Sequence, residues 1–541
     1  MKQPITKLSH SWLIGLLILA YVFIQSFCIR QLTINYDEGL FAEYGTTLLK
    51  LQGNKDIVKF DSKLPITALN MLPRAVEQLF HPGLTKPNAI ADIIRGRYIS
   101  LLATITLALL IYHWSALLYG KNAGLFSFLI FLLCPNFLAH GIFVSSDIFG
   151  CLFMTASFYF LWKFSKSGQI KNFLFASLSV ALAQISKFSM IHLLILFLLL
   201  LPVIYFFHRQ IVPGQKFSAG KLIGLVFIFA GINWFVICAG HLFYGMFVPL
   251  NNYEFRSTVF QNIQQLLHNV GDKLLLPLPS AYIKSMDAVM YFDHLGGGMP
   301  GSLNGKSYIL GKSSVNGFWY YYFVVMLYKT TLPVLLLLCL TVFLYFKKYS
   351  SYSFLRNEMY LILPAVYYLI YLDFFYSTQL GIRHIMIILP LLYIFTGFFI
   401  QQINAMPGWY FSCGLIVYQC ISVGLYFPHF LPYTNELITD KKMAYKKIAD
   451  TNLCYGEGGK FLMEYRNRHP EASYLPEKIS PGKIVMEVNE MLNLNIATMG
   501  KYDWVRGLTP SGHIQSQYLI FEVSRVQADS LRKVHTVRWY K

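Results

Sequence analysis

Long apolar runs, each close to the length of a membrane crossing, recur along most of this chain. The first covers Ser11 to Cys28, and others include Ile99 to Leu118 and Trp409 to Phe427. A bilayer core takes about 20 apolar residues per helix, so the runs predict about eleven transmembrane helices. The composition agrees, because 55% of the 541 residues are hydrophobic and 13% are charged, against about 25% charged in ordinary soluble domains. The sequence therefore predicts a polytopic α-helical membrane protein.

Positive residues around these runs predict the orientation of the chain. Cytoplasmic loops of membrane proteins carry an excess of Lys and Arg. Lys2 and Lys7 precede the first run, and Lys163, Lys166 and Lys171 form a later cluster. We therefore expect a cytoplasmic N-terminus and, after an odd number of spans, an extracytoplasmic C-terminus. The expected location is the plasma membrane, which in a bacterium is the inner membrane.

The net charge and the cysteines exclude two other classes of site. The formal net charge of +19 indicates, in a membrane protein, orientation and contact with anionic membrane lipids. We expect no nucleic-acid partner, since the sequence carries no RNA- or DNA-binding motif. None of the eight cysteines forms a Cys-x-x-Cys pair, so neither a zinc site nor a disulfide framework is indicated.

Two polar segments and a polar C-terminal region are predicted to lie outside the membrane. The segments cover about 30–97 and 244–316, within a transmembrane catalytic domain of residues 1–427. Residues 428–541 form a region of a size that can fold alone, and we expect a small α/β domain there. Its predicted elements are a helix near Glu457 to Arg468 and strands at Lys483 to Val488, Tyr518 to Val523 and Val534 to Trp539.

Two adjacent carboxylates, Asp37 and Glu38, follow the first apolar run, at the membrane surface away from the N-terminus. Asp37 is well placed to cap a helix, because Phe41, Tyr44 and Leu48 recur behind it at helical spacing. A carboxylate at a helix N-terminus stays ionised, since that end carries partial positive charge. The pair therefore suits a general base or a metal ligand, with a simple helix cap as the alternative.

Further charged residues are predicted at the same membrane face. Asp147 opens an apolar helix, and an ionisable residue at the head of a span is a candidate for function. The alternative is again a helix cap, shared with Ser145 or Ser146. The cations expected at this face are Lys187, Lys329, Arg383 and Arg95 or Arg97. Each alone is explained as well by pairing with lipid headgroups, so the hypothesis depends on the group.

Acids and cations together at one membrane face favour the transfer of a sugar from a lipid phosphate. Such a transfer needs a base that takes a proton from the acceptor hydroxyl. It also needs cations or a metal to hold the departing phosphate. Arginine suits phosphate through its forked donors, and lysine through its point charge.

The order of these stretches resembles the GT-C membrane glycosyltransferases, especially family 39 and its bacterial relatives. That group includes protein O-mannosyltransferases and the enzymes that add aminoarabinose to lipid A. The resemblance covers most of the chain. The matching stretches are Asp37-Glu38 with Pro65, Ser146-Asp147, Ser186-Lys187-Phe188, Gly311 to Pro333 with Trp319-Tyr320-Tyr321 and Lys329-Thr330, Gly381-Ile382-Arg383-His384 with Pro390, and Phe427 to Glu436.

The resemblance implies a GT-C fold and a polyprenyl-phosphate sugar as donor at the outer membrane face. The sugar would pass, with inversion, to a hydroxyl group of a lipid, a glycan or a protein. Asp37 would be the catalytic base, Glu38 would assist it, and Asp147 would bind the acceptor or a metal. The residues that would hold the donor phosphate are Lys187, Lys329, Arg383 and Arg97.

The chain departs from these relatives at two places. Residues 451–457 read Thr-Asn-Leu-Cys-Tyr-Gly-Glu, where bacterial relatives often read Ser-Asn-Leu-Asp-Trp-Gly-Gln. This departure leaves the acceptor open. Gly39-Leu40 follows the acidic pair, where relatives often have His or Pro, and clustered histidines are few. A divalent metal therefore stays an open alternative.

A transporter or flippase for a lipid-linked or anionic substrate is the alternative class of function. Charges within a membrane also mark transport pathways. The sequence has no clear inverted repeat and no pair of broken helices in two halves, which are typical of transporters. A membrane scaffold, the third class, would not need an acidic pair beside the bilayer. The sequence names neither the sugar nor the acceptor.

Overall fold

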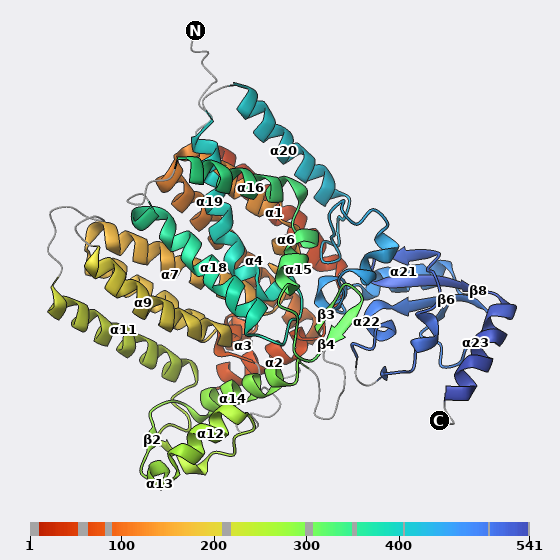
Figure 1. The fold of residues 1–541 in the computed structure, drawn as a ribbon, viewed down its shortest axis with the longest axis horizontal. Helices are drawn as coiled ribbons and strands as arrows, with labels where there is room; N and C mark the ends of the chain where they lie inside the picture. The colour runs from red at the N-terminus through yellow and green to blue at the C-terminus, as the bar shows by residue number, and fades with distance from the viewer. Residues whose placement is uncertain are drawn as a thin grey trace.

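The structure is a computed structural model that describes residues 10–51, 63–81, 89–207, 218–297, 307–348, 354–403, 406–495 and 498–538. Figure 1 shows a bundle of helices that holds most of the chain. A smaller part of mixed strands and helices, formed by the C-terminal residues, lies at one side of this bundle (Figure 1).

Five helical segments are long and apolar enough to cross a membrane, among the residues that the structure describes. They are α1 (His10–Gln31), α4 (Ala89–Tyr119), α7 (Asp147–Ser167), α9 (Ile191–Phe206) with the turn before it, and α11 (Ala219–Gly240). A sixth span is present if α15 (Tyr321–Lys329) and α16 (Leu332–Lys347) are counted together, although the chain bends by 118° between them. The predicted class of polytopic helical membrane protein is confirmed, and the count of about eleven helices stays a prediction.

Shorter helices complete the bundle and its outer segments. Pro333 in the first turn of α16 explains the bend after α15, because proline begins a helix readily but cannot continue one. The other helices before residue 428 are α2 (Glu38–Leu49), α3 (Ala68–Phe80), α5 (Lys121–Leu132), α6 (Pro135–His140), α8 (Ile170–Gln184), α12 (Thr258–Leu266), α13 (His268–Gly271), α14 (Ser280–His294), α18 (Met359–Phe374), α19 (Leu389–Gln401) and α20 (Met406–Gly424). Two small sheets pair β1 (Val248–Pro249) with β2 (Leu275–Leu276) and β3 (Ser307–Ile309) with β4 (Lys312–Ser314).

Several helices carry lysines at one of their two ends. α7 has Lys166 in its last turn and Asp147 in its first. α8 begins beside Lys171 and ends shortly before Lys187, and α16 has Lys347 in its last turn. The ends that carry Asp147 and lead to Lys187 therefore lie opposite the ends that carry Lys166 and Lys171.

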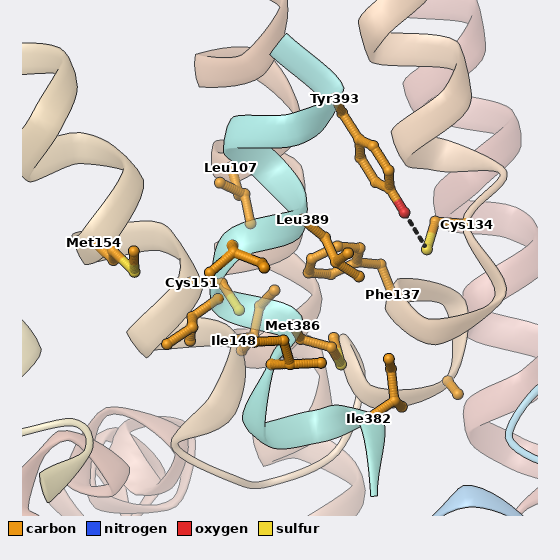
Figure 2. Packing of buried hydrophobic residues seen from close by; sticks show 14 of the residues in the cluster. Leu107, Cys134, Phe137, Ile148, Cys151, Met154, Ile382, Met386, Leu389 and Tyr393 are labelled. Carbon is orange, nitrogen blue, oxygen red and sulfur yellow. Dashed lines mark hydrogen bonds between the residues drawn. The ribbon is translucent and has the colours of Figure 1, made fainter. Parts of the chain in front are cut away.

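A dense apolar core fixes the chain on either side of Arg383. Ile382 and Met386 are both fully buried. Figure 2 shows the segment that leads into α19 running between side chains of α7 and side chains of the α5–α6 region. The labelled residues around it are Leu107, Cys134, Phe137, Ile148, Cys151, Met154, Leu389 and Tyr393. Because such cores are close-packed, the backbone of Arg383 is held in place from both sides.

The C-terminal residues form a four-stranded sheet with the order β5-β6-β8-β7. β5 (Ser473–Tyr474) is parallel to β6 (Gly482–Glu487), whereas β8 (Tyr518–Val523) is antiparallel to β6 and to β7 (Gly512–Ile514). The helices of this part are α21 (Gly459–Arg468), α22 (Val488–Met491) and α23 (Arg525–Arg538). The expected helix and the first two expected strands therefore match α21, β6 and β8.

The third expected strand, Val534 to Trp539, is wrong. Residues 534–538 belong to α23, and residue 539 lies outside the described residues. The reason is a helical spacing upstream, where Ala528 and Leu531, three residues apart, both pack against the core. Residues three apart share one face of a helix, so the segment buries that face as a helix.

The C-terminal part is joined to the segment that precedes α2. The Thr33 N–H donates to the Glu457 carbonyl at 2.9 Å, and the Tyr36 N–H donates to the Tyr455 carbonyl at 3.1 Å. The Gly459 N–H returns a bond to the Thr33 hydroxyl at 3.1 Å. The residues just before Asp37 are therefore paired with the stretch that follows the last apolar helix.

Candidate active site

A cavity of about 270 Å³ lies at the end of the bundle away from the lysine-rich ends. One wall is charged and consists of Asp37, Lys63, Asp147, Lys187 and Arg383. Another wall is apolar and is formed by side chains of α14, α18 and the start of α9. These include Ile191, Met286, Val289, Met290, Tyr371 and Leu372. The cavity therefore combines a charged region with an adjoining apolar surface.

Asp37 stands at the N-cap position of α2, but its side chain makes no helix-cap hydrogen bond. Its Oδ2 accepts from the Tyr455 hydroxyl at 2.5 Å and from Arg383 Nη1 at 3.1 Å. Lys63 Nζ lies 3.7 Å from the other oxygen, Oδ1. Burial raises the pKa of Asp37, but Lys63 and Arg383 outweigh it and hold the pKa below its usual range. Asp37 is therefore an ionised carboxylate at a cavity.

Asp147 and Lys187 form the second charged pair of the cavity. Lys187 Nζ donates to Asp147 Oδ1 at 2.6 Å and to the Arg383 carbonyl at 3.2 Å. Asp147 opens α7, and Lys187 follows the end of α8, so the antiparallel packing of these two helices brings the pair together. Arg383 thus contacts Asp37 through its guanidinium and Lys187 through its backbone.

Glu38 and Arg97, both predicted for this site, contact each other and do not line the cavity. Arg97 donates through Nε and Nη2 to the two oxygens of Glu38, at 2.8 and 2.6 Å. The Asn35 N–H and the Val144 N–H also donate to Glu38. Arg97 further donates to backbone carbonyls between Ile29 and Thr33. This arrangement supports the start of α2.

Lys329 likewise lies away from the cavity. Its side chain is 2% exposed, and Nζ donates to the carbonyls of Leu431 and Asn452, at 2.6 and 2.8 Å. Lys329 therefore binds the stretch that follows α20 to the end of α15.

The sequence analysis singled out neither Lys63, which lines the cavity, nor Tyr455, which binds the cavity residues Asp37 and Arg383. Lys63 is buried and its ammonium lies 4.1 Å from the centre of the Phe41 ring. The available signal for Lys63 was its place two residues before Pro65, which belongs to the resemblance. For Tyr455 the signal was its place in the stretch that departs from the relatives.

The described residues contain no group of three or more His, Cys, Asp or Glu side chains that could hold a metal ion. Asp37 and Asp147 are the carboxylates of the cavity, and each is already paired with cations. Metal dependence stays an open alternative for these residues.

The comparison with family models gives one match. Residues 91–234 match the family described as dolichyl-phosphate-mannose-protein mannosyltransferase. This stretch contains Asp147 and Lys187. A comparison with curated proteins finds no match.

Two solved structures of ArnT from Cupriavidus metallidurans are similar to the chain, one in the apo state and one bound to undecaprenyl phosphate. For each, the sequence identity is 12%, the TM-score is 0.47, and 77% of this chain is covered. The chain spans 65% of the length of these ArnT chains. With its apolar spans and its family match over residues 91–234, the chain is an integral membrane protein, and its resemblance to the GT-C fold glycosyltransferases is confirmed.

Proposed function

We propose that this protein transfers a sugar from a polyprenyl phosphate to an acceptor hydroxyl at the extracytoplasmic face of the membrane. The observation that carries the proposal is the charge of the cavity wall. Two carboxylates, Asp37 and Asp147, share this wall with three cations, Lys63, Lys187 and Arg383. One positive charge is left over, which suits the single negative charge of a phosphodiester donor.

The donor phosphate has partners of the right chemistry in this wall. Arg383 Nε is buried and, among the described residues, has no hydrogen-bond partner, so one forked donor is left for a phosphate oxygen. Lys187 and Lys63 add point charges to the same wall. The apolar wall offered by α14 and α18 suits the first units of a polyprenyl chain. Cations placed where charge develops stabilise the departing phosphate.

Asp37 is the proposed general base. It is held ionised, it faces the cavity, and its Oδ1 is the oxygen that Tyr455 and Arg383 leave open. In a single displacement, the acceptor oxygen attacks the anomeric carbon, its proton passes to Asp37, and the bond to phosphate breaks. The electron pair of that bond leaves with the phosphate. The anomeric centre is inverted because attack and departure occur on opposite sides.

The proposed acceptor is a lipid, a glycan or a protein hydroxyl group, and Asp147 is proposed to help bind it. The remaining parts of the proposal concern orientation and domains. The lysine-rich helix ends face the cytoplasm, which puts the cavity and residues 428–541 outside. Those residues are proposed to form a separate extracytoplasmic domain.

The test is sugar transfer by the purified protein in lipid, with labelled polyprenyl-phosphate sugars and a membrane extract as acceptor. Asp37→Asn should lower the rate about 10²–10⁴-fold, the usual loss for a general base. The control is Asp529→Asn, which changes an exposed carboxylate on α23 and should keep the rate. Full activity of folded Asp37→Asn would refute the assigned base. Movement of the donor across the membrane without sugar transfer would favour a transporter or flippase instead.

A further inference from the structure

Tyr455 reaches the cavity carboxylate from a distant part of the chain. It lies 418 positions from Asp37, and its hydroxyl donates to Asp37 Oδ2 at 2.5 Å. Arg383 Nη1 donates to the same hydroxyl, and the guanidinium carbon lies 4.9 Å from the centre of the Tyr455 ring. The residue is 3% exposed. The C-terminal stretch therefore supplies a side chain that contacts both Asp37 and Arg383.

The backbone of Tyr455 is fixed on both sides. Its N–H donates to Glu457 Oε2 at 3.0 Å, and its carbonyl accepts from the Tyr36 N–H at 3.1 Å. The ring packs edge-on against Phe143 at a centroid distance of 6.1 Å. A side chain held in this way loses little further freedom when it orients another group.

The direction of the hydroxyl proton follows from its partners. A guanidinium has donors only, so the Tyr455 oxygen must accept from Arg383. The one proton of the hydroxyl is then left for Asp37 Oδ2. Burial raises the pKa of Tyr455 well above its usual value, so the hydroxyl keeps that proton. Oδ2 thus receives two hydrogen bonds, and Oδ1 is turned toward Lys63.

We propose that Tyr455 is a positioning residue for Asp37, which fixes the carboxylate so that Oδ1 faces the acceptor hydroxyl. The proposal rests on the proposed role of Asp37 as base. Attachment of the C-terminal stretch thereby becomes a requirement for fast transfer, because the orienting hydroxyl comes from it. Tyr455 gives its one hydroxyl proton to Asp37 and only accepts from Arg383, so its loss acts on the rate of the chemical step more than on donor binding.

The test compares two variants that each remove one hydroxyl group from the same junction. Tyr455→Phe removes the bond to Asp37, and Tyr36→Phe removes a 2.5 Å bond to Glu487 that does not touch Asp37. Hydrogen bonds to charged groups predict a loss of kcat of about 10–100-fold in Tyr455→Phe. The KM for the donor should change less than kcat, since Arg383 keeps its bond to Asp37 and its open Nε donor. Tyr36→Phe should keep both values.

A double variant separates positioning from general support of the fold. If Tyr455 acts through Asp37, Asp37→Asn with Tyr455→Phe should be no slower than Asp37→Asn alone. If the rate losses of the two single variants multiply in the double variant, or if Tyr455→Phe keeps the wild-type kcat, the proposal is overturned while Asp37 remains the base. Full activity of Asp37→Asn would overturn the base and the positioning role together. If Tyr455→Phe lowers the melting temperature more than Tyr36→Phe, a fluorinated tyrosine at position 455 replaces it; this residue keeps the hydroxyl but lowers its pKa, so it should change kcat more than KM without a loss of stability.

Discussion

Glu38 and Arg97 form an ion pair that is almost fully excluded from solvent, one residue along the chain from the cavity carboxylate Asp37. The two oxygens of Glu38 lie 2.8 and 2.6 Å from the arginine nitrogens, and the side chains are 0% and 1% exposed. Arg97 comes from α4 and also binds carbonyls at the end of α1. The pair therefore holds three helices around the start of α2, and Asp37 is placed as a result.

Glu38→Gln should destabilise the protein by about 3–5 kcal/mol, because it leaves the charge of Arg97 buried without its partner. The measurement is thermal unfolding in detergent. The control is Glu77→Gln, since Glu77 and Arg95 form a pair with side chains 36% and 42% exposed, worth about 0–1 kcal/mol. An unchanged melting temperature with lost activity in Glu38→Gln would instead support the direct catalytic role that the sequence predicted.

Lys187→Met should weaken donor binding, whereas Lys329→Met should lower stability and leave donor binding unchanged. Lys187 faces the cavity, so its loss should raise the donor KM by about 10–100-fold, the value of a hydrogen bond to a charged group. Lys329→Met leaves two backbone carbonyls without their donor and should lower the melting temperature with an unchanged KM. Kinetics and thermal unfolding on the same two preparations check both. An unchanged donor KM in Lys187→Met would remove it from the proposed phosphate site.

Lys63→Met should move the acid limb of activity to higher pH. Lys63 is the largest of the influences that lower the pKa of Asp37, ahead of Arg383, while burial alone would raise it. Without Lys63, less positive charge offsets the effect of burial, so the pKa of Asp37 rises. The measurement is kcat/KM against pH, and Lys442→Met, a change at the surface pair with Asp440, should leave the limb in place. A limb that stays where it is in Lys63→Met would show that Lys63 does not control Asp37.

The same depressed pKa makes Asp37 a source of stability at neutral pH. The folded pKa lies below the model-compound value of 3.8. A carboxylate of this kind stabilises the fold at pH values above about 4 and loses that contribution as the pH falls through the folded value. Wild-type protein should therefore lose stability on acidification in this range, and Asp37→Asn should lose less. Parallel acid unfolding of the two proteins measures the difference.

Gly45→Ala should destabilise the packing of α2, whereas Gly39→Ala should not. A Cβ at Gly45 would stand 2.7 Å from the Thr67 carbonyl oxygen, so backbone must move, at a cost of about 1–3 kcal/mol. At Gly39, no heavy atom of the described residues lies within 4 Å of such a Cβ. Alanine there should raise helix stability by up to about 1 kcal/mol. Equal melting temperatures of the two variants would contradict the close approach at Gly45.

The sequence predicted four of the charged residues that the structure brings to one cavity, Asp37, Asp147, Lys187 and Arg383. It could not separate Asp37 from Glu38, because both are acidic and adjacent. Successive residues of a helix point about 100° apart, so one side chain faces the cavity and its neighbour faces Arg97. The packing of the surrounding helices determines which of the two carboxylates faces the cavity.

Contacts between distant parts of the chain set the second limit of prediction. Lys329 follows an aromatic stretch at the outer end of a predicted span, as a phosphate ligand would, yet its partners are two backbone carbonyls of the C-terminal stretch. Tyr455 was visible only as a departure from relatives, and nothing in one sequence places it on Asp37. Apolar length predicted the long spans well, whereas the bend between α15 and α16 depends on local turn geometry.

The bond between Asp37 and Tyr455 also has a consequence for biosynthesis. A ribosome adds about 5–20 residues per second, so the 418 positions between the two residues take about 20–80 s to make at these rates. During that time the proposed base has already been made and lacks its orienting hydroxyl. A nascent chain that has not yet reached residue 455 therefore lacks the hydroxyl that is proposed to orient Asp37.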